Sequence, residues 1–232
     1  MNILEYRAAQ DKVNQSMAAF LLKALRLSGN IVTLGQLEIL TRILFPQVSQ
    51  HRSASANLAK TFYDSMRALE VTDGSVSPPL RIPQYKVDSL LSMLKRVYAP
   101  KLKDATAQVD PAMVIGETTK HVEDAARQST ISMIARDPLK VRYQRFDPGI
   151  PCAFCALLIS RGAVYLTNET AGFRAHAHCR CMPIPVFKGQ RNWTGKAEAT
   201  KYEKLYASAT KGSGDSLTAF RRAYADSVAG SK

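Results

Sequence analysis

Apolar residues recur at helical spacing through the first 138 residues, and this pattern predicts a series of amphipathic helices. Each such helix carries one apolar stripe, which is buried when the helices pack together. The predicted helices cover residues 4–27, a segment from Thr33 to just before Pro46, residues 50–70, residues 87–99 and residues 111–136. Proline removes a helix hydrogen bond, so we expect Pro46 and Pro100 to lie just past the ends of their helices.

Two of these helices carry start signals. Thr33 and Gln36 have the spacing of a capping box, in which each side chain accepts a hydrogen bond from the other residue's backbone. Asp110 precedes a proline that suits the first position of a helix. The residues predicted to form the buried stripes of the first two helices are Val13, Met17, Leu21, Ala24 or Leu25, Leu37, Leu40 and Leu44.

After Pro138 the period changes. The pattern predicts short strands at 141–146 and 163–166, a helical turn at 156–160 and a loop at 167–174. Residues 182–187 alternate apolar residues with prolines, and proline cannot donate to a sheet, so this segment is predicted to be an edge strand or an extended arm. Helical spacing returns at 195–209 and again from residue 215 onward.

These elements predict a mainly α protein with three parts. Residues 1–138 form an α-helical N-terminal domain, residues 139–190 form a small α+β module, and residues 191–232 form a helical C-terminal tail. The module has few apolar residues, and a core of that size needs a further link such as a bound metal.

All four cysteines lie between Cys152 and Cys181, together with two of the four histidines. Two residues separate Cys152 from Cys155, a spacing at which both thiolates reach one tetrahedral ion. The stretch therefore predicts a structural Zn²⁺ site.

Three different chemistries compete with this interpretation. A thioredoxin-like redox pair would follow a strand of a βαβ unit, whereas a turn precedes this pair. The second is a cysteine–histidine nucleophile, and the third is a catalytic zinc with Glu169 as the one acid between the ligand pairs.

The second half of the ligand set is open from spacing alone. His176 with Cys179, and His178 with Cys181, have the same separation. In an extended chain His178 and Cys179 would point to opposite sides, whereas Cys179 and Cys181 would share a side and could complete an all-cysteine site. The two remaining histidines, His51 and His121, occur on predicted helices without a partner ligand and are predicted to be ordinary histidines.

The net charge of the chain indicates which class of partner it binds. The chain carries a formal net charge of +13, with an isoelectric point near 9.7. This balance favours polyanionic partners, either nucleic acid or an acidic protein surface. The longest apolar run near the N-terminus is too short for a signal peptide, and no membrane-spanning stretch occurs, so we expect an intracellular chain that does not contact membranes.

Residues 140–190 resemble the minor head proteins of tailed phages. The resemblance rests on the run from Val141 to Arg145, on Cys152-Ala153-Phe154-Cys155-Ala156, on Ser160-Arg161-Gly162-Ala163-Val164-Tyr165, and on the closing His176-Ala177-His178-Cys179-Arg180-Cys181. This closing segment is similar to the terminal signature of the MuF-like family, especially its actinobacteriophage members. That family keeps a histidine at the position of His176, so the resemblance favours His176 over His178, with Cys179 ahead of Cys181 as its partner.

The resemblance implies a role in the assembly of the phage head. Such a protein lies in the virion, inside the head near the portal, and is present in the host cytoplasm during assembly. Its implied partners are portal or capsid protein, with non-specific contact to packaged DNA. Some actinophage relatives are described as capsid maturation proteases, so a protease or a zinc-dependent nuclease is the competing function. However, Ser160 has no histidine and acid at recognisable spacing, and no His-Glu-x-x-His motif occurs. We therefore expect an assembly protein rather than an enzyme.

Overall fold

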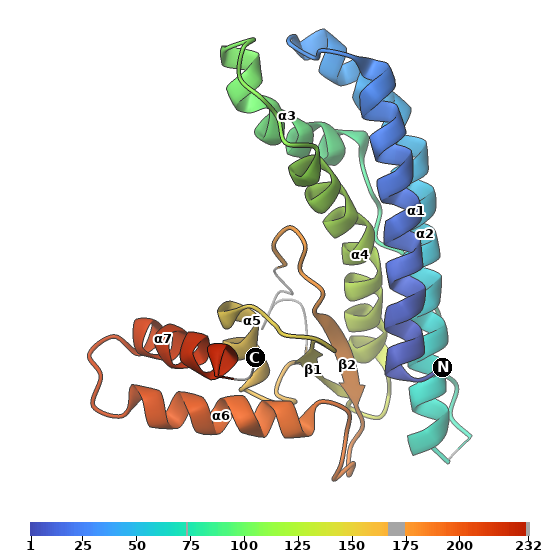
Figure 1. The fold of residues 1–232 in the computed structure, drawn as a ribbon. Coiled ribbons are helices and arrows are strands. Elements are labelled where there is room, and N and C mark those ends of the chain that lie inside the picture. Colours follow the sequence, from blue (N-terminus) through green and yellow to red (C-terminus); the bar gives the residue numbers. More distant parts are fainter. Residues whose placement is uncertain (73, 167–174, 231–232) are drawn as a thin grey trace. The chain divides into compact units, whose positions relative to one another are not determined.

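The computed structural model describes residues 1–72, 74–166 and 175–230, which form seven helices and one two-stranded sheet (Figure 1). The helices are α1 (Ile3–Ser28), α2 (Leu34–Glu70), α3 (Val87–Lys103), α4 (Pro111–Arg136), α5 (Ala153–Ile159), α6 (Lys196–Thr210) and α7 (Ser216–Ala229). The strands are β1 (Arg142–Phe146) and β2 (Met182–Val186). The mainly helical fold predicted from the sequence is confirmed. The loop predicted at 167–174 lies outside the described residues. None of the described helices is long and apolar enough to cross a membrane.

The chain divides into two compact units. The first unit comprises Met1–Ser65, Pro79–Thr130 and Phe173–Cys179. The second unit comprises Met66–Pro78, Ile131–Gly172 and Arg180–Lys232. The long helices α2 and α4 each contribute residues to both units.

In the first unit, α1 and α2 form a hairpin and lie side by side over much of their length (Figure 1). Their predicted stripes form the core, and Val13 packs against it partly buried. Six stripe residues are buried: Met17, Leu21, Ala24, Leu37, Leu40 and Leu44. α3 and α4 contribute further buried residues to the same core, among them Leu90, Leu94, Val114 and Val122. The periodicity therefore identified the buried faces correctly.

The predicted start signals are also confirmed. The Thr33 backbone N–H donates to Gln36 Oε1 at 3.0 Å, and the Gln36 N–H donates to Thr33 Oγ1 at 3.3 Å. Asp110 Oδ1 accepts from the Ala112 N–H at 2.8 Å, at the start of α4. These bonds satisfy backbone donors that the first turn of a helix leaves without an intrahelical partner.

The prediction that prolines end two of the helices was wrong. Pro46 lies inside α2, which continues unbroken to Glu70, and Pro100 lies inside the last turn of α3. A proline in a helix interior costs about 3 kcal/mol. In α2 the buried Leu44 and Val48 flank Pro46, and burying two such side chains contributes about 3–6 kcal/mol. The packing therefore outweighs the lost hydrogen bond.

In the second unit, β1 and β2 pair antiparallel, with Gln144 opposite Ile184. Tyr143 is opposite Pro185, but its backbone pairs on the other side with Tyr165, whose carbonyl accepts from the Tyr143 N–H at 2.8 Å. Pro185 is therefore not required to donate a hydrogen bond to β1. The edge strand predicted at 182–187 is confirmed as β2, whereas the strand predicted at 163–166 is a single bridge at Tyr165.

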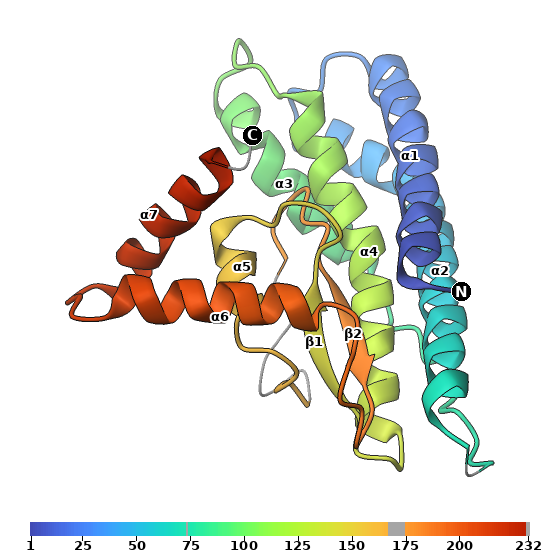
Figure 2. The ribbon, with the colours of Figure 1, turned by 60° about the horizontal axis from the view of Figure 1, so that its bottom comes forward.

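The helices of the second unit pack through a small aromatic core. α5 contacts both α6 and α7, and these two helices also contact each other; they lie side by side in Figure 1 and diverge from their connecting loop in Figure 2. The buried residues of this aromatic core are Ala156, Ile159, Ala199, Tyr202, Phe220 and Tyr224. The Tyr224 hydroxyl donates to the carbonyl of Pro151, just ahead of the first cysteine. This core therefore fixes α5, which carries the cysteine pair.

Candidate metal centre

The first cysteine pair lies at the start of α5. Cys152 is the N-cap, with an extended backbone, and its Sγ accepts a hydrogen bond from the Cys155 N–H at 3.4 Å. Cys152 is exposed, whereas the Cys155 side chain is buried on the face of α5. The helix begins three residues earlier than the turn predicted from the sequence, and its first turn brings the two sulfurs close together.

The second part of the site is a turn at residues 176–179. The Cys179 N–H donates to the His176 carbonyl at 3.1 Å, and His178 has a positive φ of 60°. His176 Nδ1 lies 2.7 Å from the carbonyl oxygen of Ala177. A carbonyl can only accept, so Nδ1 carries the proton and Nε2 carries the lone pair that a metal can bind.

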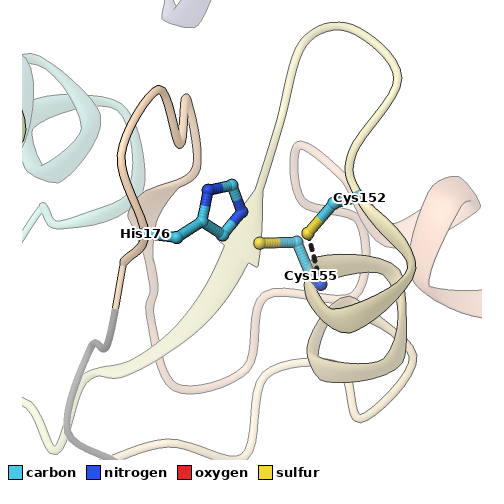
Figure 3. Close-up of side chains that lie close together, drawn as sticks. All are labelled: Cys152, Cys155 and His176. Atoms are coloured by element: carbon cyan, nitrogen blue, oxygen red, sulfur yellow. Dashed lines mark hydrogen bonds between the residues drawn. The ribbon is translucent and has the colours of Figure 1, made fainter. Parts of the chain in front are cut away.

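Five of the six candidate ligands fall into two overlapping groups. Cys152, Cys155 and His176 form one group, and Cys155, Cys179 and Cys181 form the other. Within each group the ligand atoms all lie within 4.8 Å of one another. Figure 3 shows the His176 ring directed toward the Cys155 sulfur, with the Cys152 sulfur beside the Cys155 backbone nitrogen. The shared member, Cys155, is therefore the ligand common to both arrangements.

Each group of three ligand atoms is compact enough to share one ion. With Zn–S bonds of about 2.3 Å, two sulfurs on one zinc lie about 3.8 Å apart. Ligand atoms within 4.8 Å of one another are thus at most about 1 Å farther apart than that spacing. Thiolates and a neutral imidazole are the donors that zinc prefers, and no oxygen ligand is needed to complete the set. The residues present therefore suit Zn²⁺.

Helix α4 holds the second half of the ligand set through a buried arginine. Arg127 Nη2 donates to the Cys179 carbonyl at 2.6 Å. The same guanidinium pairs with Glu123 and, at 2.9 Å, with Asp124. Burial lowers the pKa of Arg127, but the two carboxylates together raise it by a larger amount, so the net shift is upward. The arginine therefore stays charged in the interior. This residue was not predicted from the sequence, although Glu123 and Arg127 are four residues apart within the apolar face of α4.

Cys181 and His178 have other neighbours. The Cys181 thiol donates to Asp147 Oδ2 at 3.6 Å. The His178 ring lies against α4 at Gly116, so closely that a Cβ on that glycine would be 2.3 Å from Nε2. His178 belongs to neither of the two ligand groups among the described residues, and neither do His51 and His121.

Comparison with known proteins shows the family. A family model described as VG15 protein matches residues 2–209. The chain belongs to the VG15 protein family. The VG15 match includes all six candidate ligands and most of α6, so it covers both ends of the cysteine-rich stretch.

Two mycobacteriophage proteins are similar to this VG15 family member. The Gene 15 protein of Mycobacterium phage L5 is 27% identical over 258 aligned positions, which cover 90% of this chain and 85% of that protein. The Gene 15 protein of Mycobacterium phage D29 is 28% identical over 211 positions, covering 74% of each. No solved structure matched the chain. The VG15 chain is thus a member of a phage protein family.

Proposed function

We propose that this VG15 family member is a minor head protein of the MuF-like kind, acting in procapsid and head assembly near the portal. Two observations support the proposal. The family is a phage family, with relatives in two mycobacteriophages. In addition, the segments that resemble the MuF-like signature, 152–156 and 176–181, are those that carry the two ligand groups. In this role the chain binds portal or capsid protein inside the head.

The observation that carries the proposal is the clustering of cysteines and histidine around Cys155. We propose that Cys152, Cys155, His176 and Cys179 hold a structural Zn²⁺, with Cys181 as the alternative fourth ligand. Cys179 is preferred because Arg127 fixes its backbone, whereas the Cys181 thiol faces the carboxylate of Asp147. A metal-bound thiolate has no proton to donate to that carboxylate.

An assembly role fits the site better than proteolysis. Ser160 is the serine within the segment that resembles the phage proteins, and its hydroxyl donates to the Leu157 carbonyl at 2.7 Å. A serine nucleophile needs a base that accepts its proton, whereas this hydroxyl caps the end of α5. Incubating the purified chain with the capsid precursor and with DNA tests for an enzyme, because a binding protein cleaves neither.

Metal analysis of alanine variants tests the site. The purified protein should contain about one zinc per chain, because the stretch holds one tetrahedral set. Cys152→Ala, Cys155→Ala and His176→Ala should each lose zinc, and Cys179→Ala should lose more than Cys181→Ala. His178→Ala is the matched control and should keep it.

Three results would contradict this assignment. Absence of zinc, together with four freely reactive thiols in the folded wild-type protein, would exclude the site. Zinc kept in His176→Ala but lost in His178→Ala would reverse the histidine assignment. Zinc kept in both histidine variants would indicate the four-cysteine site.

Detection in purified heads tests the assembly role. Quantitative mass spectrometry of purified phage heads should find the chain at a few copies per head, and a pull-down from assembling heads should recover portal or capsid protein. Absence of the chain from both mature heads and procapsids would refute the head role without bearing on the zinc site.

A further inference from the structure

The end of the α1–α2 hairpin carries an open apolar groove that the zinc site does not use. Its volume is about 510 Å³, and both helices and the segment between them line it. Its lining includes Phe20, Lys23, Leu27, Ile31, Ile39 and Ile43.

Large apolar side chains of this groove face solvent. Leu27 is 78% exposed, Ile39 is 61% exposed and Ile43 is 50% exposed. Ile39 and Ile43 are one helical turn apart on α2, on a face adjacent to the one that buries Leu40 and Leu44. Single exposed leucines are ordinary on protein surfaces, but three large apolar residues in one groove mark a binding surface.

The charges around the groove are predominantly basic. Lys23 is the one charged residue that lines it, and no carboxylate lines it within the described chain. Within the stretch that lines the groove, residues 20–43, the exposed charged residues are three basic ones, Lys23, Arg26 and Arg42, and one acidic one, Glu38. A partner that buries apolar residues here therefore gains from acidic groups on its flanks.

We propose that this groove binds an amphipathic α-helix of another head protein, with its apolar face inward and Asp or Glu residues along its edges. The partner's location in the head rests on the proposed function above. A helix in a groove matches the shape, because two antiparallel helices offer a channel into which a third helix packs. A second copy of the same hairpin is disfavoured, because it would bring Lys23, Arg26 and Arg42 against like charges.

Two synthetic peptides test the chemistry on the purified full chain. Both are amphipathic helices of about five turns with leucine on one face, and the flanking residues are glutamate in one and lysine in the other. The glutamate peptide should bind at least about tenfold more tightly by fluorescence anisotropy. Ile39→Glu should abolish this preference, whereas Leu4→Glu, at a 66% exposed position on α1 outside the groove, should not. Equal binding of both peptides, or equal loss in both variants, would overturn the proposal.

A photo-crosslinking residue at position 39 then identifies the occupant in assembling heads, with the same residue at position 4 as control. Crosslinks from position 39 to an acidic amphipathic helix of a different protein support the proposal. Crosslinks to a second copy, to DNA, or at no higher yield than from position 4 would overturn it. The peptide result does not depend on head location, so it separates failure of the groove from failure of the proposed function.

Discussion

Partly buried His121 should make the stability of the first unit depend on pH. Its Nδ1 lies 2.7 Å from the Tyr85 hydroxyl, and it accepts from that hydroxyl when the neutral ring carries its proton on Nε2. Arg52 donates to the His121 backbone carbonyl and stacks over the Tyr85 ring, with its Cζ atom 4.2 Å from the ring centroid. Protonation would remove the acceptor nitrogen of the imidazole and place its positive charge near that of Arg52.

The direction and size follow from the pKa of His121. Burial, and then the charges of Lys120 and Arg52, lower this pKa from 6.5 to about 4, with Arg96 adding to the effect and Glu117 opposing it. Between these two values the unfolded chain binds a proton at His121 that the folded chain does not bind. Stability therefore falls as the pH falls through this window. The full shift is worth at most about 3 kcal/mol, and partial exposure of the ring reduces the expected loss to about 2 kcal/mol by about pH 4.5.

Urea unfolding of the wild type and of His121→Gln, followed by circular dichroism from about pH 7 to pH 4.5, measures this loss. Glutamine can still accept from Tyr85 but does not titrate. From about pH 7 to pH 4.5 the wild type should therefore lose about 2 kcal/mol more unfolding free energy than His121→Gln loses. Carboxylate protonation and metal loss affect both proteins and cancel in the difference. A difference that stays flat over this range, or an NMR titration of the His121 ring near its ordinary value, would refute the reasoning.

Two further predictions concern the buried arginine and the charge of the chain. Arg127→Met should lower the unfolding free energy by about 3 kcal/mol, because it leaves Glu123 buried beside one cation fewer, and should weaken zinc binding about tenfold by releasing the Cys179 backbone. Arg96→Met, which breaks an exposed ion pair, should cost less than about 1 kcal/mol; equal effects of both variants on zinc affinity would contradict the positioning role. DNA binding driven by the net charge of +13 should be independent of sequence and weaken at least about tenfold from about 50 to 200 mM salt. A flat salt response in an anisotropy assay would mean that the charge serves another partner.

Helix faces were predictable from the sequence because each follows from local spacing. The stripe through Met17 and Leu21 and the capping box at Thr33 need no knowledge of distant residues. Pro46 was misjudged for the opposite reason. Its local cost is known, but the burial that offsets it depends on packing against other helices, which spacing within one segment does not reveal.

The candidate site was predictable to a similar depth. Residue type and spacing predicted the cysteine pair, because two thiolates separated by two residues can reach one ion. The contact from Arg127 to Cys179 joins positions 52 residues apart, and a basic residue on a helix is most often a solvated one. Only the presence of Glu123 one turn earlier, on the same apolar face, indicated that this arginine is buried as part of a pair.

The choice between the two histidines shows where an assumption about backbone, rather than chemistry, limits the inference from sequence. Alternation of side chains along an extended chain separates His178 from Cys179 and pairs Cys179 with Cys181. The structure instead has a turn closed by the His176–Cys179 hydrogen bond, with His178 in the left-handed region. Alternation does not hold through such a turn, since a positive φ redirects the side chain. The resemblance to MuF-like proteins favoured His176 without assuming any backbone, and His176 is the histidine that the turn directs toward Cys155 (Figure 3). The ligand choice therefore depends on the turn, and the zinc content of the His176→Ala and His178→Ala variants tests it directly.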